Sequence, residues 1–161
     1  MRTLVLGLGN PILTDDGVGI HVVRAAAALG SACEVDMQEA SVGGLRLLEI
    51  ISGYDQVILV DALQTGGGNP GDVLRLSCAE LPCLRHSGCS HDLSLTGALA
   101  LGQTLGLELP AAESIRVVGV EVEDVLTFGE SCTPAVAAAI PTAVGAVLAE
   151  LEGLPLGLVT R

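Results

Sequence analysis

The sequence predicts an α/β domain in three layers, with helices packed on both faces of a mostly parallel sheet. Apolar segments of strand length alternate with longer segments of helical pattern, in an order typical of that architecture. Hydrophobic residues make up 50% of the chain and aromatic residues only 1%, so the core must be aliphatic, which suits helices on a parallel sheet. The 161 residues suffice for a full core, and we expect a single domain over residues 1–161.

The expected strands are short and strongly apolar. Residues 3–8 and 57–60 are continuous apolar runs, which predicts strands that are covered on both faces. The full set of expected strands comprises residues 3–8, 33–37, 57–60, 72–76 and 115–120.

Helical patterns fill the segments between these strands. The first helix follows Asp15 or Asp16, either of which we expect to cap it, and Gly30 ends it. Gly53 ends the second helix in the same way. The expected helices are one that runs to about residue 29, followed by residues 45–52, 92–106 and 134–151.

The last of these helices is unusually apolar. We expect Thr133 as its N-cap and Pro134 as its first residue, with a kink at Pro141. The apolar stretch, residues 135–148, is too short for a membrane span. We therefore expect a helix that is buried against the rest of the domain.

The charge of the chain restricts its partners. The formal net charge is −12, and the seven basic residues are all arginines. Nucleic acids and anionic membranes both require a basic surface, so neither is expected as a partner. A cationic partner surface or a metal ion fits the acidic balance better, although acidity that serves only solubility fits equally well.

The five cysteines predict a reducing compartment. Their number is odd and the N-terminus leads straight into a strand, so we expect a cytoplasmic protein without a disulfide framework. Cys78, Cys83 and Cys89 lie close to His91 in sequence, which raises the possibility of a zinc or iron–sulfur site. Their spacing lacks the paired C-x-x-C pattern of such sites, which favours small buried or loop thiols.

The turn after the first strand carries a glycine pattern that partly matches two known motifs, neither of which binds a metal. Gly7 and Gly9 match the first half of a dinucleotide-binding motif, but Ile12 replaces its third glycine. The carboxylates of Asp15 and Asp16 would also repel a pyrophosphate at that helix start. Residues 7–11 resemble the beginning of peptidyl-tRNA hydrolases, but the later motifs of that family do not follow, and the net charge argues against a tRNA ligand.

A third interpretation is a carboxylate–histidine site. Asp16 follows the first strand, Asp61 ends the third, and His91 opens the helix after the long loop. These positions share one edge of a parallel sheet, so the three side chains can converge there. Two carboxylates and an imidazole suit a divalent transition metal, and they also suit general-base catalysis with a water. His21, inside a helix, and His86, in an irregular loop, are weaker candidates.

Each of the three residues also has a purely structural explanation. Asp16 can serve as an N-cap, a role for which Asp15 competes. Asp61 can bond to a neighbouring loop, and His91 can be a hydrogen-bonded residue at a helix start. The coincidence of all three at one sheet edge favours a functional site.

Taken together, these residues resemble the hydrogenase maturation protease family, the endopeptidases that trim the large subunit of nickel–iron hydrogenases. The resemblance covers nearly the full length of the chain and rests on the order and spacing of its motifs. These motifs are residues 7–10, 14–19, 43–45, 60–62, 90–95, 118–121 and 132–136.

The resemblance implies a five-stranded twisted sheet between helices, with one short antiparallel strand at residues 72–76. It also implies that Asp16, Asp61 and His91 occupy the metal-contacting positions of the family. Family members carry Glu or Asp at the first position, and the shorter Asp16 here would shift the metal slightly. The family removes a C-terminal peptide from the hydrogenase precursor only after nickel insertion, so the nickel is expected to come with the precursor, and no organic cofactor is implied.

A mechanistic hypothesis follows from this resemblance. Asp16, Asp61 and His91 contact the precursor's nickel, and either the metal or one of the carboxylates activates a water against the scissile bond. The Gly9 backbone or the Asn10 side chain orients the peptide. Metal ligation and an aspartic-protease-like role remain alternatives for the two carboxylates. We expect a monomer, and the three cysteines of residues 77–90 are placed where they could touch the client's metal centre.

A different class of function is compatible with the same residues. A non-catalytic assembly chaperone or checkpoint protein would use the site to hold the nickel centre of the precursor without cleaving it. Turnover with peptide release distinguishes the protease from this alternative.

Overall fold

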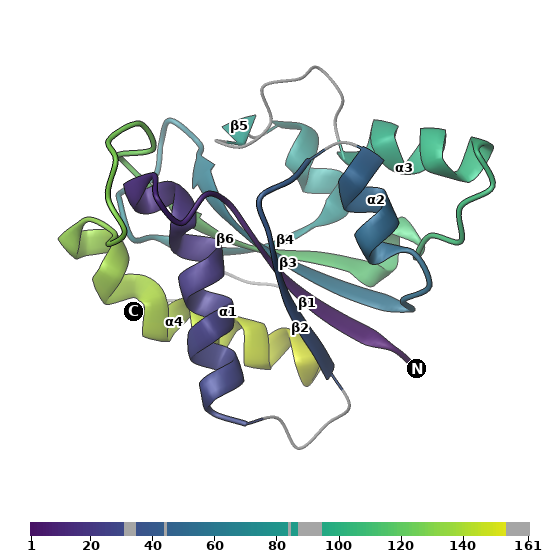
Figure 1. The fold of residues 1–161 in the computed structure, drawn as a ribbon, viewed down its shortest axis with the longest axis horizontal. Helices are drawn as coiled ribbons and strands as arrows, with labels where there is room; N and C mark the ends of the chain where they lie inside the picture. The colour runs from purple at the N-terminus through teal and green to yellow at the C-terminus, as the bar shows by residue number, and fades with distance from the viewer. Residues whose placement is uncertain (31–34, 44, 84, 87–94, 154–161) are drawn as a thin grey trace.

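The computed structural model describes residues 1–30, 35–43, 45–83, 85–86 and 95–153, and it has an α/β architecture (Figure 1). One sheet runs through the molecule, with its long strands in the order β2-β1-β3-β6-β4. The strands are β1 Thr3–Leu8, β2 Val35–Ala40, β3 Gln56–Gln64, β4 Val73–Ser77, β5 Arg85–His86 and β6 Ile115–Glu121.

The directions of the strands confirm the predicted mixed sheet. The β2, β1, β3 and β6 strands are mutually parallel, and β4 runs antiparallel to β6 at the edge. The two-residue β5 pairs with the end of β3 in antiparallel fashion and adds a short strand that the sequence did not predict. His86, which was expected in an irregular loop, lies in this strand.

Helices cover both faces of the sheet, as the sequence predicts. Figure 1 shows α1 and α4 on one face, and α2 and α3 on the other. The helices are α1 Val18–Ala28, α2 Leu45–Ile51, α3 Leu95–Thr104 and α4 Pro134–Leu151, with short 3₁₀ turns η1 Thr14–Gly17, η2 Cys78–Cys83 and η3 Ala112–Ser114.

Two aliphatic clusters fill the spaces between the layers. Alternate residues of β3 point to opposite faces, so Val60 joins the cluster under α1 and α4 while Leu59 joins the one under α2 and α3. Val5 and Leu4 divide in the same way on β1. The central strands β1 and β3 are therefore covered on both faces, as their continuous apolar runs predict.

Some predicted boundaries were wrong. β2 continues to Ala40, three residues past the predicted end. The prediction stopped too early because β2 is an outer strand, on which polar side chains such as Gln38 and Glu39 are exposed. The helix predicted over residues 92–106 is described from residue 95 and ends at Thr104, and Gly106 follows it with a φ of 81°. Residues 92–94 lie outside the described part of the chain.

The C-terminal helix α4 has the predicted bounds, with Thr133 at the N-cap position and Pro134 as its first residue. By length and composition alone this helix could cross a membrane, so the prediction that it is too short was wrong, and the prediction of a buried helix holds only in part, because 33% of it is buried inside the domain. It packs one face against α1 and β6 through Val136, Ala139 and Val147. Pro141 lies inside this helix without interrupting it, and the kink expected there stays a prediction.

Candidate active site

Close backbone packing shapes the turn that follows β1. Gly9 has a φ of 133°, and a Cβ atom there would lie 1.8 Å from the carbonyl oxygen of Asp16. A Cβ atom on Gly19 would lie 2.2 Å from the Val60 carbonyl oxygen. Only glycine fits these positions, because η1 lies directly against the turn after β1, and the start of α1 lies directly on the end of β1 and the middle of β3. The packing of the helix on the sheet thus explains the glycine pattern that resembles half of a dinucleotide motif.

Asp16 lies in η1, just before α1, and is 6% exposed. Its Oδ2 atom accepts a hydrogen bond of 2.8 Å from the Asn10 backbone N–H. The N-cap of α1 is Gly17, and no side chain caps the helix. The predicted capping role of Asp15 or Asp16 was therefore wrong, because the extra 3₁₀ turn moves both residues ahead of the helix.

Asp15 is fully buried and serves a structural purpose. Its carboxylate accepts hydrogen bonds from the backbone N–H groups of Glu123, Asp124 and Thr133, at 3.3, 3.1 and 2.7 Å, and from the Thr133 hydroxyl at 3.0 Å. These bonds fasten the turn that carries Asp16 to the loop between β6 and α4.

Asp61 lies within β3 and is 8% exposed. The prediction that it ends this strand was wrong, because β3 continues to Gln64 and pairs with β6 beyond Asp61. Its Oδ1 atom accepts a hydrogen bond of 2.8 Å from the Ala62 N–H. Its register partner on β6 is Gly119. By strand alternation, Asp61 lies on the same sheet face as Leu59, the face that α2 and α3 cover.

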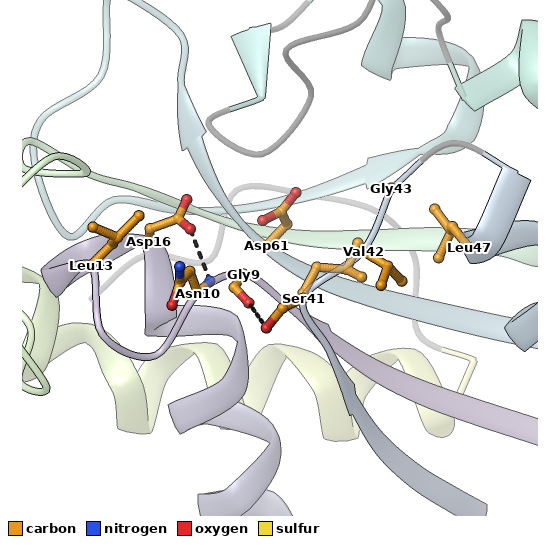
Figure 2. Close-up of a pocket in the computed structure, with 10 residues that line it drawn as sticks. Gly9, Asn10, Leu13, Asp16, Ser41, Val42, Gly43, Leu47 and Asp61 are labelled. Carbon is orange, nitrogen blue, oxygen red and sulfur yellow. Dashed lines mark hydrogen bonds between the residues drawn. The ribbon is translucent and has the colours of Figure 1, made fainter.

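Asp16 and Asp61 line one pocket of about 290 Å³. Figure 2 shows their side chains on the same side of the turn formed by Gly9 and Asn10. The walls come from the end of β1, the segments that follow β1 and β2, and Asp61 in the second half of β3, at the carboxyl side of the sheet where open α/β sheets hold their ligands. The lining residues are Leu8, Gly9, Asn10, Leu13, Asp16, Ser41, Val42, Gly43, Leu47 and Asp61.

The turn beside the carboxylates is held by its own polar groups. The Gly9 N–H donates to the Ala40 carbonyl at 3.2 Å, and the Gly9 carbonyl accepts from the Ser41 hydroxyl at 2.7 Å (Figure 2). The Asn10 Oδ1 atom accepts from the Ile12 N–H at 3.2 Å, which is an Asx-turn. The backbone of Gly9 is thus bound to the end of β2, and Asn10 stabilises the turn at the edge of the pocket.

Sequence reasoning missed the contribution of β2 to this pocket. Ser41 and Val42 directly follow β2, so they reach the same sheet edge as Asp61. The strand was predicted to end at residue 37, which placed these residues too far from the edge. Asp15 was also missed as a tether, because its partner Thr133 is distant in sequence.

The other histidines and cysteines considered as site residues do not gather at this pocket within the described part of the chain. His91 and Cys89 lie outside the described residues. His21 is half-buried in α1, and its Nε2 atom has no hydrogen-bond partner. Cys78 and Cys132 are free thiols, and no group of three His, Cys, Asp or Glu side chains among the described residues gathers into a metal site.

The pKa of the Cys132 thiol is raised to about 11, mainly by burial and secondarily by the negative charge of Asp15. Burial also raises the pKa of the Cys78 thiol. Both thiols are therefore protonated at neutral pH, which is the state of an unreactive cysteine.

Comparison with known proteins gives the site its context. Residues 20–150 match the family model described as hydrogenase maturation protease. The chain belongs to the hydrogenase maturation protease family. The resemblance seen in the sequence motifs is thereby confirmed, and the protein is a hydrogenase maturation endopeptidase, a hydrolase.

Individual relatives agree with this family. The chain is 33% identical over 154 residues to the hydrogenase 2 maturation protease of Escherichia coli K12, a match that covers 94% of this chain and 92% of that protein. The structure of the E. coli hydrogenase-maturating endopeptidase HybD superposes with a TM-score of 0.78 at 32% identity, covering 95% of this chain and 93% of that one. HybD from Thermococcus kodakarensis shares the fold, with a TM-score of 0.65 at 24% identity over 94% and 99% of the two chains.

Proposed function

We propose that this hydrogenase maturation endopeptidase removes the C-terminal extension of a nickel–iron hydrogenase large-subunit precursor after nickel insertion. The observation that carries the proposal is the placement of Asp16, in the 3₁₀ turn η1, and of Asp61, in β3, on one pocket at the carboxyl side of the sheet. The E. coli relative that spans nearly the same length is named for maturation of hydrogenase 2. A precursor of that class is therefore the substrate to test first.

The donor set that we propose suits a transition-metal centre that arrives with the substrate. Carboxylate oxygens from Asp16 and Asp61 and an imidazole nitrogen from His91 are a ligand combination that divalent transition metals accept. Each carboxylate is nearly buried, so contact with a cationic centre takes place in surroundings where charge attraction is weakly screened. We infer that these three residues contact the nickel of the precursor, and that this contact selects the nickel-loaded form.

The hydrogen bonds of the site prepare the carboxylates for this task. One oxygen of Asp16 is held by the Asn10 N–H, and one oxygen of Asp61 by the Ala62 N–H. Such bonds to backbone amides fix the orientation of each carboxylate before the substrate arrives. A carboxylate oriented in this way serves equally as a metal contact or as the general base that takes a proton from the attacking water.

We infer that Asn10 and Gly9 orient the peptide. The Asn10 Oδ1 atom already bonds to the Ile12 N–H, so its Nδ2 group is the part of the side chain that would donate to a peptide carbonyl. The Gly9 N–H is engaged by Ala40, which leaves only its carbonyl, already bonded to Ser41, as a contact for substrate.

A cleavage assay followed by mass spectrometry tests the proposal. The substrate is nickel-loaded large-subunit precursor, with nickel-free precursor as the control. We expect loss of a C-terminal peptide from the loaded form alone. Tight binding without peptide release would instead favour the assembly-checkpoint role, and no interaction with either form would reject the substrate assignment.

Variants of the two carboxylates test the site. Asp16→Asn and Asp61→Asn each keep the shape of the side chain and remove its charge, so we expect cleavage to fall at least about 100-fold. Asp55→Asn is the matched control, because Asp55 is an exposed carboxylate that also accepts a backbone hydrogen bond, from Arg2 at 2.6 Å. Retained cleavage in Asp16→Asn would remove that residue from the mechanism.

We also infer a cytoplasmic, monomeric enzyme. The free thiols of Cys78 and Cys132 suit a reducing compartment. Cell fractionation checks the location, and sedimentation velocity of the purified protein checks the oligomeric state.

A further inference from the structure

Large apolar side chains are exposed to solvent on the loop between β6 and α4. Leu126 is 84% exposed and Phe128 is 80% exposed, and Ile12 on the neighbouring turn is 47% exposed. Phe128 is one of only two aromatic residues in the chain, and the other, Tyr54, is buried. We refer to Ile12, Leu126 and Phe128 as the loop surface.

The loop surface is built on a fixed backbone. The Gly129 N–H donates to the Ile12 carbonyl at 3.0 Å, and the Thr14 N–H donates to the Gly129 carbonyl at 2.9 Å. The Thr14 hydroxyl donates to the Thr127 carbonyl at 2.6 Å. Figure 1 shows the green loop standing beside the purple 3₁₀ turn at this point. Two segments far apart in sequence are thus joined, and the exposed side chains project from a rigid base.

Asp124 braces the tip of the loop. Its Oδ1 atom accepts from the N–H groups of Leu126 and Thr127, at 3.1 and 2.9 Å. These bonds lower the pKa of Asp124, so the carboxylate stays charged and the brace stays in place at neutral pH. A surface that is already ordered loses little conformational entropy on binding, which is the property of a preformed docking site.

The loop surface adjoins the pocket. Leu13 lines the pocket and lies between Ile12 and Thr14, the two residues that bond to Gly129. The Asp16 N–H in turn donates to the Leu13 carbonyl at 3.0 Å. A substrate that has its cleavage site in the pocket therefore reaches the loop surface with its neighbouring residues.

Acidic side chains accompany the loop surface. Glu123 and Glu130 are exposed on the same loop, and Asp124 is half-exposed. An apolar surface with carboxylates beside it complements a partner segment in which an apolar side chain stands next to lysine or arginine. Aromatic residues such as Phe128 are also enriched in the centres of protein interfaces.

We propose that Ile12, Leu126 and Phe128 form a docking surface for the hydrogenase large-subunit precursor, and that it binds a precursor segment with an apolar side chain beside a lysine or arginine. The proposal rests on the proposed function, because it takes the precursor as the partner. It adds a binding contact outside the pocket, which contributes to affinity for the precursor and takes no part in the chemical step.

The test is the double variant Leu126→Ser/Phe128→Ser. Leu105→Ser is the matched control, because Leu105 is 62% exposed and directly follows α3, which Figure 1 shows at the opposite end of the molecule from the loop. We expect the double variant to keep its thermal midpoint, to raise KM for nickel-loaded precursor at least about tenfold, and to change kcat less than about twofold. Leu105→Ser should match the wild type in all three.

Calorimetric titration with the same precursor separates failure of this proposal from failure of the proposed function. If the wild type does not cleave the precursor, the proposed function fails. The affinity for the precursor still tests the docking surface in that case, and tenfold weaker binding by the double variant than by the wild type supports it. Unchanged KM and unchanged binding would overturn it. A wild-type dimer in sedimentation velocity that the double variant lacks would also overturn it, because a second copy would then be the occupant.

A charge variant tests the chemistry assigned to the partner. Glu123→Gln/Glu130→Gln leaves the apolar side chains in place and removes two of the neighbouring charges. We expect weaker binding to the precursor and a smaller loss of affinity when salt is raised. Salt dependence equal to that of the wild type would contradict the basic character of the bound segment.

Discussion

Asp15 and Thr133 lie 118 positions apart in the sequence and share two hydrogen bonds. The Thr133 N–H donates to Oδ1 at 2.7 Å, and its hydroxyl donates to Oδ2 at 3.0 Å. Thr133 thus holds the N-cap position of α4 without using its own side chain as a cap. The carboxylate next to the candidate catalytic residue Asp16 joins the first turn of the domain to the last helix.

Removal of the Asp15 carboxylate should destabilise the whole domain. In Asp15→Ala, four donors lose their acceptor at a fully buried position. We expect the free energy of unfolding to fall by about 3 kcal/mol or more, because buried donors without partners are costly. Urea unfolding at pH 7 measures this, and Asp55→Ala, at an exposed carboxylate, should cost less than about 1 kcal/mol. An equal loss of unfolding free energy in the two variants would show that the Asp15 carboxylate stabilises the domain no more than an exposed carboxylate does.

Two glycine-to-alanine substitutions should change the stability of the fold in opposite directions. Gly19→Ala places a Cβ atom 2.2 Å from the Val60 carbonyl oxygen and 2.5 Å from that of Leu8, so α1 must move away from the sheet. We expect a loss of about 1–3 kcal/mol, the usual cost of overpacking. Gly145 lies exposed in α4 with nothing within 4 Å, and Gly145→Ala should gain up to about 1 kcal/mol from helix propensity. Thermal unfolding of both variants checks the pair, and a stable Gly19→Ala would contradict the packing described for α1.

The ion pair between Arg75 and Glu150 should depend on both partners. Its atoms are 2.7 Å apart, and the two side chains are only 7% and 4% exposed. Arg75→Ala leaves a buried carboxylate whose remaining ion pair among the described residues is with Arg116, at 3.8 Å, so we expect a loss of about 3 kcal/mol.

Replacement of both buried partners should recover much of that loss. In Arg75→Met/Glu150→Leu, no uncompensated charge remains, and apolar packing takes the place of the pair. The exposed pair Arg24–Glu39 is the control, because Arg24→Ala should cost less than about 1 kcal/mol. A double variant less stable than Arg75→Ala would contradict this account.

Alkylation of Cys132 should show its raised pKa. With a pKa of about 11 in the folded protein and about 8.5 in the unfolded chain, the native thiol holds its proton over a pH range in which the unfolded thiol loses it. The contribution of Cys132 to stability is therefore complete below about pH 8.5 and is lost as pH rises towards 11. We expect the native alkylation rate, followed by peptide mass spectrometry, to keep rising about tenfold per pH unit up to pH 10. In urea the rate should level off near pH 9, and a similar plateau in the folded protein would disprove the shift.

The layers of the fold could be predicted because local sequence signals decide them. The apolar runs of β1 and β3 indicate strands covered on both faces, and Thr133-Pro134 marks the start of α4. The edge strand β2 was placed imperfectly because its exposed polar residues carry no such signal.

The candidate site was predictable only in part. The rule that ligands bind at the carboxyl edge of a parallel sheet brought Asp16 and Asp61 to one place, and both line the pocket. Their roles in catalysis stay predictions, and His91 lies outside the described residues. The tether from Asp15 to Thr133 could not be foreseen, because no local pattern predicts a contact between residues 118 positions apart.

The same tether has a consequence for biosynthesis. At about 5–20 residues per second, a ribosome needs roughly 6–24 seconds to travel the 118 positions from Asp15 to Thr133. During that interval the turn that carries Asp16 has been made, but Thr133, which fixes it to the start of α4, has not. The emerging chain therefore passes through a period in which this turn lacks its tether, and the turn is fixed only after Thr133 has left the ribosome.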